Sequence, residues 1–441
     1  MKYLVFLVAM AAGVPFIAIT SSLFPRLKRL FFAVMVVSFL FNSMTSINIL
    51  SMEYYRGPVR GFEVTFADLI AWGLALGMLV RTPSKIVWKP RFTIILFVFF
   101  AYAIVSLLRA GNSILGWFAI WQLARAGALY WVTVNFFKTE DVSRDSIKTL
   151  IGAYIASGII LALITFKQKY LDGIYRAWAF FDHSNTIPSF TLIFMCVLLV
   201  WLLYEKDVSF LLFFLALMAA LGSLFAIFAT GSRTGMAAGA ALVVGSLIVG
   251  NRKNNDIRAK RTTLLIIICM LIGAIFVADT VIDRFLNAPP ASEEARNEFE
   301  IAAEMMAEDH PTGVGLNLYS KVLTETQEYR QHIEVMRNEE QAGVAHHIYL
   351  LTAAEMGYLG LFIFATILLI FLASMIIRGI RWSTLEQRLL LAVAMGFTMV
   401  CAIGFYEWVL RQTPVLYQTV VALGFTQALF DKASPVKERN T

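Results

Sequence analysis

The chain has 441 residues, of which 59% are hydrophobic and 15% are charged. Soluble domains carry about 25% charged residues, so this composition excludes an ordinary soluble globular protein. The formal net charge of +7 does not indicate nucleic-acid binding. The basic residues lie in short loops between apolar runs, the distribution typical of the cytoplasmic loops of membrane proteins.

The apolar residues form blocks of about 17–25 residues, the length at which a helix crosses a bilayer core. These blocks are too long and too uniform for the alternating strands of a membrane β-barrel. We therefore predict an all-α fold, a polytopic helical bundle of 12 or 13 transmembrane helices. The predicted spans are 3–24, 30–50, 64–80, 92–108, 117–137, 149–166, 189–204, 210–229, 235–250, 264–281, 357–377, 389–410 and 414–430.

Loop charge predicts the orientation of this bundle. If the helices alternate in direction, four basic segments share one side, which the positive-inside rule assigns to the cytoplasm. These segments are 26–29, 81–91, 251–261 and 378–388.

The long segment 282–344 then lies on the outer side. It carries thirteen Asp and Glu residues against five Lys and Arg residues. The predicted organisation is therefore transmembrane helices 1–10 in residues 1–281, a large periplasmic loop in residues 282–344, and C-terminal transmembrane helices in residues 345–441.

The large loop has helical signals of its own. Pro289 and Pro290 end the preceding helix, and Ser292 with two following glutamates has the pattern of an N-cap and an acidic first turn. Two stretches with helical apolar spacing then predict two amphipathic helices over a membrane cavity, with a solvated loop as the alternative. The apolar positions are Phe299, Ala302, Met305 and Met306, then Leu318, Val322, Tyr329, Ile333 and Met336.

Charged residues within or beside apolar runs are candidates for function, because a charge is costly in a bilayer. Arg233 lies between two runs, and a fixed cation there suits either phosphate binding or an interfacial position. Arg176 lies among aromatic residues that suit sugar rings or an interfacial belt. Arg125 lies inside a run, and pairing with Glu407 or Glu355 explains it as well as a functional role does.

His346 and His347 open a predicted helix at the outer membrane surface. A histidine there can serve as a general base near neutral pH or can have a structural role. Adjacent helical positions point about 100° apart, and no second ligand follows at zinc-site spacing, so no metal site is predicted. Glu355 lies on the other side of this helix from His346, and we expect it to be a structural anchor.

Four segments resemble, in order, motifs of the O-antigen ligase and polymerase superfamily of bacterial envelope glycosyltransferases. The resemblance covers residues 149–378, and it lies in the order and spacing of the motifs together. The segments are RAWAFFDHSN (176–185), TGSRTG (230–235), HPTGVGLNLY (310–319) and AHHIYLLTAAEMGYLGL (345–361).

The resemblance implies a GT-C-like glycosyltransferase and assigns roles to particular residues. His346 matches the catalytic histidine of the family, and Arg233 and Arg176 match arginines of the lipid-diphosphate cavity. His347 stands where Asn or Ser is usual, which leaves open which histidine acts as the base. The residues expected to bind substrate are His347, Arg125, Asn185, Gly313 and Gly315.

The implied reaction is metal-independent, inverting transfer of a glycan from a polyprenyl-diphosphate carrier to an acceptor hydroxyl on the periplasmic side. His346 would deprotonate the acceptor, and the two arginines would stabilise the charge that grows on the diphosphate. The acidic loop would exclude water. No cofactor is expected.

The implied partners are the carrier-linked glycan, an acceptor glycan or lipid A–core, and membrane lipids, without nucleic acid. The implied location is the bacterial inner (cytoplasmic) membrane. Polymerase, ligase and protein O-glycosylation activities remain open, with polymerase slightly favoured. The alternative from another class is a transporter or flippase for lipid-linked glycan or polysaccharide.

Overall fold

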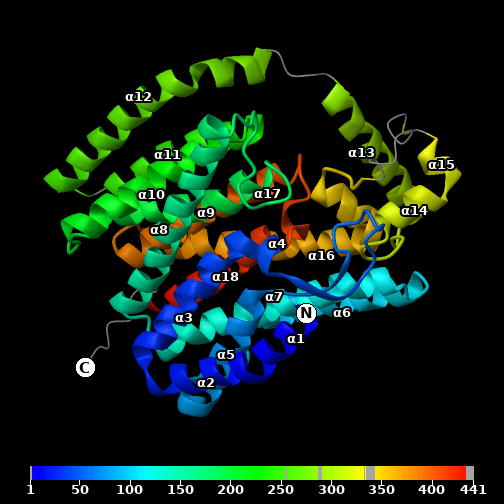
Figure 1. Ribbon diagram of the computed structural model, residues 1–441, viewed down its shortest axis with the longest axis horizontal. Helices are drawn as coiled ribbons and strands as arrows, with labels where there is room; N and C mark the ends of the chain where they lie inside the picture. The colour runs from blue at the N-terminus through cyan, green and yellow to red at the C-terminus, as the bar shows by residue number, and fades with distance from the viewer. Residues whose placement is uncertain are drawn as a thin grey trace.

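The computed structural model describes residues 2–252, 254, 256–286, 291–331, 333 and 343–433. Long helices make up most of it, as the apolar runs predict (Figure 1). The α-helices are α1 (Lys2–Val8), α2 (Val14–Leu23), α3 (Pro25–Ser38), α4 (Asn42–Thr45), α5 (Phe66–Arg81), α6 (Thr93–Arg109), α7 (Ile114–Thr139), α8 (Arg144–Phe166), α9 (Thr186–Tyr204), α10 (Phe210–Ala229), α11 (Arg233–Asn251), α12 (Ile257–Leu286), α13 (Ala291–Asp309), α14 (Tyr319–Glu325), α15 (Gln327–Arg330), α16 (Ile348–Gly379), α17 (Leu385–Ile403) and α18 (Thr413–Ala433). The other elements are the strands β1 (Ile47–Ser51) and β2 (Gly61–Val64), the π-helical turns η1 (Ala9–Gly13) and η4 (Lys167–Leu171), and the 3₁₀ turns η2 (Phe39–Phe41), η3 (Pro83–Lys85) and η7 (Val409–Arg411).

The predicted spans coincide with helices, and eight segments of the described chain are long and apolar enough to cross a membrane. The chain is thus a multi-pass, all-α membrane protein. The predicted spans at α5, α6, α7, α12 and α18 are not among these eight, so the number of 12 or 13 crossings stays a prediction. The eight are Tyr3–Leu23, Pro25–Thr45, Arg144–Leu171, Thr186–Tyr204, Phe210–Ala229, Arg233–Asn251, Ile348–Gly379 and Leu385–Ile403.

Two predicted spans are wrong at their ends. The span 30–50 stops at Thr45, and β1 follows, paired antiparallel with β2. The span 389–410 stops at Ile403, and residues 404–412 form a loop. That loop is tied to the start of α16, because the Gly404 carbonyl accepts a hydrogen bond of 2.8 Å from the Ile348 amide.

The large loop is folded where the structure describes it, but two of its predicted boundaries change. Helix α12 runs to Leu286, past the predicted boundary at residue 281. The second amphipathic helix is divided into α14 and α15 at Thr326, whose backbone is extended. Met336 and the side chains of the predicted cap at residues 292–294 lie outside the described residues.

The first amphipathic helix of the loop forms as predicted. In α13, Phe299, Ala302 and Met306 are buried, and they pack with Tyr319 of α14 and Leu351 of α16. The apolar face of α13 therefore covers the start of α16, as a lid over the bundle would.

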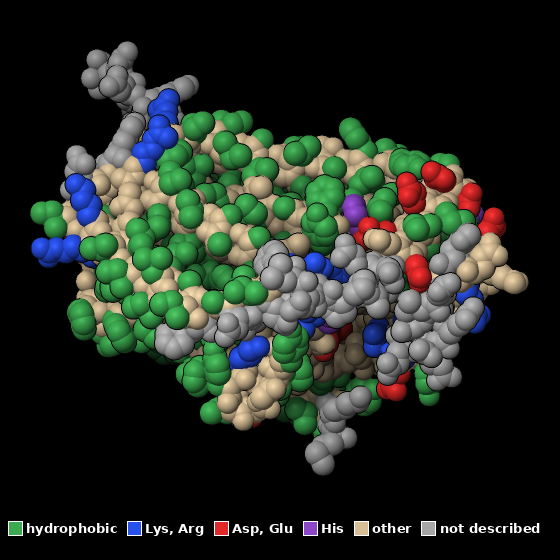
Figure 2. Space-filling model, turned by 90° about the horizontal axis from the view of Figure 1, so that it is seen from above, with side chains coloured by type: hydrophobic (Ala, Val, Ile, Leu, Met, Phe, Trp, Pro, Cys, Tyr) green, Lys and Arg blue, Asp and Glu red, His purple; other side chains and the backbone are tan. Residues whose placement is uncertain are grey.

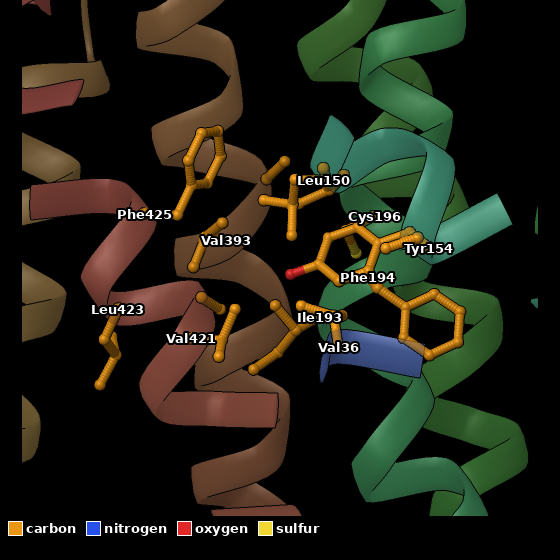
Figure 3. Packing of buried hydrophobic residues seen from close by; sticks show 14 of the residues in the cluster. Val36, Leu150, Tyr154, Ile193, Phe194, Cys196, Val393, Val421, Leu423 and Phe425 are labelled. Carbon is orange, nitrogen blue, oxygen red and sulfur yellow. The ribbon is translucent and has the colours of Figure 1, made fainter. Parts of the chain in front are cut away.

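Helix α9 lies at the centre of the bundle, and every residue of it except Tyr204 is buried. A helix that is apolar on all faces must be surrounded by other helices. Figure 3 shows Ile193, Phe194 and Cys196 of α9 among side chains of α3, α8, α17 and α18. The three cysteines are free, and Cys196 is buried among these side chains.

The helix α16 is broken at Gly357, where φ is 70° and ψ is 178°. The break frees carbonyl groups, and the HPTGVG segment of the loop binds them. The amides of Val314 and Gly315 donate to the carbonyls of Ala354 (2.9 Å) and Glu355 (2.8 Å). A Cβ at Gly313 would lie 2.4 Å from the Glu355 carbonyl oxygen, so only glycine fits there.

The bundle has two chemically different ends, which we call the basic end and the acidic end. At the basic end, lysines of two predicted basic segments pair with the turn between α7 and α8, as in Lys28–Glu140 (2.7 Å) and Lys85–Asp141 (2.8 Å). The acidic end holds α13–α15 and the loops 172–185 and 404–412. Figure 2 shows Asp and Glu side chains gathered at one end and a group of Lys and Arg side chains at the other.

Candidate active site

Several segments distant in sequence meet at the acidic end. The loop 172–185 is joined to the end of α10 by a hydrogen bond from the Ala177 amide to the Ala229 carbonyl (3.0 Å). Helix α11 begins beside it, because Gly231 turns the chain with φ of 63° and the Ser232 hydroxyl caps the helix by accepting from the Gly235 amide (3.3 Å). The loop 404–412 joins the start of α16.

A buried carboxylate, Glu407, links these segments. Its Oε2 lies 3.1 Å from Nδ1 of His346, and its Oε1 accepts a hydrogen bond of 3.0 Å from Nη2 of Arg296 in α13. The same Oε1 accepts from the amide nitrogen of Asn185. The Oδ1 of Asn185 in turn accepts from Nη2 of Arg176 (2.6 Å). A continuous polar chain therefore runs from Arg176 to His346.

The two histidines have different roles in this geometry. Nδ1 of His347 accepts from the Leu350 amide (3.1 Å), which makes His347 the N-cap of α16. Its ring packs against Tyr349 and Phe405, and burial lowers its pKa. His346 instead presents Nδ1 to Glu407, and a carboxylate there favours the tautomer in which Nδ1 carries the proton. Nε2 of His346 is then available as an acceptor, so the geometry favours His346 as the base.

Three arginines lie near this pair. Nε of Arg176 donates to the Thr230 carbonyl (2.9 Å), and Nε of Arg284 donates to the Gly231 carbonyl (2.9 Å). Arg296 is the third. Burial and the positive charges of Arg284 and Arg296 lower the pKa of Arg176.

The start of α11 adds to this positive region. Arg233 is the first residue of α11 and is half-buried. The backbone just before it, residues 230–231, is bound by Arg176 and Arg284. The N-terminus of a 19-residue helix favours anions, because the helix dipole is positive there. The arrangement suits a phosphate or diphosphate group.

Neighbouring groups stabilise the ionised form of Glu407. Burial alone would raise the pKa of Glu407, but the hydrogen bond and charge of His346, with Arg296 and His183, hold this pKa below its usual value. Burial lowers the pKa of His183 and raises that of Glu300, a second carboxylate close to His346. Among the described residues, no group of three His, Cys, Asp or Glu side chains could hold a metal ion.

The structure places Arg125 elsewhere. Its guanidinium pairs with Asp68 (2.8 Å) and Glu63 (2.9 Å), so the expected partners Glu407 and Glu355 were wrong. They were wrong because Glu407 lies beyond the end of α17, at the acidic end, whereas Glu355 pairs with Arg411 (2.6 Å). The contacts of Arg125 give no support to its predicted role in substrate binding.

Gly313 and Gly315 also face protein atoms. A Cβ at Gly315 would lie 2.6 Å from Cβ of Ala110, and both glycines have positive φ, 84° and 108°. These contacts favour a part in shaping the loop. Asn185, by contrast, lies inside the polar chain between Arg176 and Glu407.

Sequence reasoning missed several residues of this site, namely His183, Arg284, Arg296 and Glu407. Glu407 gave a signal, since it is a carboxylate at the end of an apolar run, but its partner could not be read from the sequence. Arg284 and Arg296 were not singled out, because segment 282–344 is acidic as a whole and its few basic residues give no pattern.

The fold and site together define a multi-pass membrane protein with a carboxylate-paired histidine beside an arginine cluster. Residues 218–365 match the family model of the O-antigen ligase. The matched segment contains Arg233, Arg284, Arg296 and His346. It confirms the similarity to the O-antigen ligase and polymerase superfamily, and with it a part in polysaccharide biosynthesis. No curated protein matches the chain.

Proposed function

We propose that the protein transfers a glycan from a polyprenyl-diphosphate carrier to an acceptor hydroxyl, and that His346 is the general base. The observation that carries this proposal is the pairing of His346 with the buried Glu407 beside three arginines. The histidine supplies a proton acceptor, and the arginines supply a site for a diphosphate leaving group.

The reaction can be written for these residues. Nε2 of His346 takes the proton of the acceptor hydroxyl as the hydroxyl oxygen attacks the anomeric carbon. The bond from that carbon to the diphosphate oxygen breaks, and the diphosphate leaves with the electron pair. Attack from the face opposite the leaving group inverts the anomeric configuration. A positioned general base contributes about 10²- to 10⁴-fold to such a rate.

Glu407 acts in this scheme as a positioning residue. Its carboxylate orients the His346 ring and stabilises the imidazolium that forms when the proton is taken. Arg176 and Arg284, with Arg233 at the start of α11, would stabilise the negative charge that grows on the diphosphate. The lid helix α13 would restrict the entry of water, which competes with the acceptor for the donor.

The acidic end would face the periplasm of a bacterium, and the protein would lie in the inner membrane. The positive-inside rule supports this orientation, because the basic segments 26–29 and 81–91 lie beside the same α7–α8 turn at the opposite end. In a transporter, Arg125 would be a candidate to line a path, because it lies inside an apolar run. Arg125 instead pairs with Asp68 and Glu63 inside the protein, which argues against a role in a transport path.

The test uses the protein in nanodiscs with a carrier-linked glycan and candidate acceptors. Release of polyprenyl diphosphate and labelling of the acceptor are measured for the wild type, His346→Ala, His347→Ala and Arg233→Ala. We expect His346→Ala to lower transfer by about 10²- to 10⁴-fold and Arg233→Ala to lower it strongly. His347→Ala is the matched control, because it removes the neighbouring histidine and the N-cap of α16 but leaves the His346–Glu407 pair in place.

The wild type must transfer glycan for the proposal to stand. If His346→Ala transfers as well as the wild type and His347→Ala does not, the base is His347 and the assignment of roles is wrong. If the wild type moves the intact carrier-linked glycan across the bilayer without releasing polyprenyl diphosphate, the protein is a transporter.

A further inference from the structure

The proposed mechanism does not use the buried ion pair between Glu355 and Arg411. Nη2 of Arg411 donates to Oε2 of Glu355 at 2.6 Å, and the side chains of Arg411 and Glu355 are 10% and 0% exposed. Burying two charges costs free energy even when they pair, so such a pair adds little to stability by itself. The position of the pair, beside the loop that carries Glu407, indicates a role in shaping the site.

The loop that carries Glu407 is fixed to α16 at both of its ends. At the first end, the Gly404 carbonyl accepts a hydrogen bond of 2.8 Å from the Ile348 amide. At the other end, the side chain of Arg411 reaches Glu355. Glu407 lies between these two attachments, and α16 begins directly after the two histidines. The loop and the histidines are therefore held by the same helix.

The stretch just before Glu407 lies at the surface. Phe405 and Tyr406 are 53% and 54% exposed. The Glu407 side chain, by contrast, is 4% exposed, and it points inward to the His346 ring. An exposed stretch leaves the direction of the next side chain to the attachments around it. The ion pair of Arg411 therefore restricts where the Glu407 carboxylate lies.

Glu355 also connects this loop to the lid helix α13. Its Oε1 accepts a hydrogen bond of 3.5 Å from the Tyr319 amide. The Tyr319 hydroxyl donates to the Phe299 carbonyl of α13 at 2.6 Å. Helix α13 carries Arg296, which donates to the other oxygen of Glu407. Glu355 therefore contacts both segments that fix the Glu407 carboxylate, its own loop directly and the lid through Tyr319.

We propose that Glu355 and Arg411 are positioning residues for the transfer reaction, and that their ion pair holds the loop so that Glu407 faces His346. The inference rests on the proposed function, in which His346 is the general base. When the pair is broken, the loop shifts and the carboxylate no longer orients the His346 ring. Donor binding should be kept, because the arginines proposed for the diphosphate lie on other segments.

A double-mutant cycle with Glu407 tests this role. Glu355→Gln and Arg411→Gln are each made in the wild type and in Glu407→Gln. If the pair acts through Glu407, its loss matters only while that carboxylate is present. We expect each change to lower kcat about tenfold or more in the wild type, with the KM for the donor unchanged. In Glu407→Gln the further loss should be less than about twofold.

Lys28→Gln is the matched control. Its ion pair with Glu140 has the same exposed fraction at the cation, 10%, and a similar N–O distance, 2.7 Å, but lies at the basic end. It should change kcat by the same factor in both backgrounds. The double variant Glu355→Gln/Arg411→Gln leaves no unpaired buried charge, so it replaces a single variant that does not fold. Arg411→Lys, which keeps the charge, should restore part of the kcat lost in Arg411→Gln.

A labelling measurement tests the same role without turnover. Diethyl pyrocarbonate modifies the unprotonated ring nitrogen of histidine, and a neighbouring carboxylate favours the protonated ring. At about pH 6, modification of His346, measured by mass spectrometry, should therefore be several-fold faster in Glu407→Gln than in the wild type. Glu355→Gln and Arg411→Gln should match Glu407→Gln. Lys28→Gln should match the wild type.

Two results would overturn the proposal. An equal loss of kcat with and without the Glu407 carboxylate would make the pair a structural element only. Wild-type labelling of His346 in both Glu355→Gln and Arg411→Gln would mean that Glu407 keeps its place without the pair. If labelling follows the expected pattern and the wild type transfers no glycan, the pair positions Glu407 and the proposed reaction is wrong.

Discussion

Two clusters of arginine and carboxylate groups in this protein have opposite charge balances. In the first, Arg125 lies between Asp68 and Glu63, and the Tyr417 hydroxyl donates to Asp68 (2.5 Å). The Arg125 side chain is only 1% exposed. Here the carboxylates outnumber the arginine, and every described partner lies inside the protein.

The second cluster surrounds Glu407, where three arginines, Arg176, Arg284 and Arg296, outnumber the two described carboxylates close to His346, Glu407 and Glu300. The side chains of Arg296 and His346 are 35% and 28% exposed. An arginine in or beside an apolar run therefore points to function only when the neighbouring carboxylates do not offset its charge. Arg125 is offset by two carboxylates, whereas Arg176, Arg284 and Arg296 are the residues that we propose to bind an anion.

The largest effect is expected for Arg125→Ala. This change leaves Asp68 and Glu63 without their cation, and breaking a buried ion pair costs about 3–5 kcal/mol of the free energy of unfolding. Thermal unfolding in nanodiscs measures it. The matched control is Arg109→Ala at the exposed end of α6, expected within about 0.5 kcal/mol of the wild type. Lost transfer with unchanged stability would place Arg125 in the substrate site and contradict the contrast between the Arg125 and Glu407 clusters.

A somewhat smaller effect is expected for Arg176→Ala. Removing one donor to a developing negative charge lowers the rate by about 10²- to 10³-fold. Stability should change little, because Arg176 is only partly buried. Arg176→Lys keeps the charge but cannot contact both Thr230 and Asn185, so it should restore only part of the rate. Full activity with Lys would mean that charge alone matters there.

Ionic strength should change the KM that depends on the Glu407 cluster several-fold and leave the stability that depends on the Arg125 cluster unchanged. Raising salt from about 0.05 M to 0.5 M screens exposed charges more than buried ones. We expect the KM for the carrier-linked donor to rise several-fold. The destabilisation caused by Arg125→Ala should be the same at both salt concentrations. A salt-independent KM would argue against a charged donor site at the Glu407 cluster.

The smallest effect concerns acid stability. Because the pKa of Glu407 is held below its usual value, its ionised form contributes stability above the unfolded pKa of about 4.3. This contribution is lost as pH falls through the lower pKa of the folded protein. The melting temperature of Glu407→Gln should therefore fall less than that of the wild type between about pH 6 and pH 3.5. An equal fall would mean that Glu407 gains nothing from its neighbours.

Much of the fold could be predicted from apolar periodicity and length. The helices at the predicted spans and the buried face of α13 follow from local pattern. The ends of elements could not be predicted so well. Thr45 and Ile403 end helices because of contacts made elsewhere, such as the bond from the Ile348 amide to the Gly404 carbonyl.

The sequence by itself determined the membrane bundle, the shared end of the basic segments and the motifs that carry the family similarity. These depend on spacing along one helix or on local charge. Only the tertiary structure decided which carboxylate meets which cation. Glu407 lies 61 residues from His346, and Arg125 lies 57 residues from Asp68. Such pairs form because helices cross and loops meet, and no local spacing encodes them.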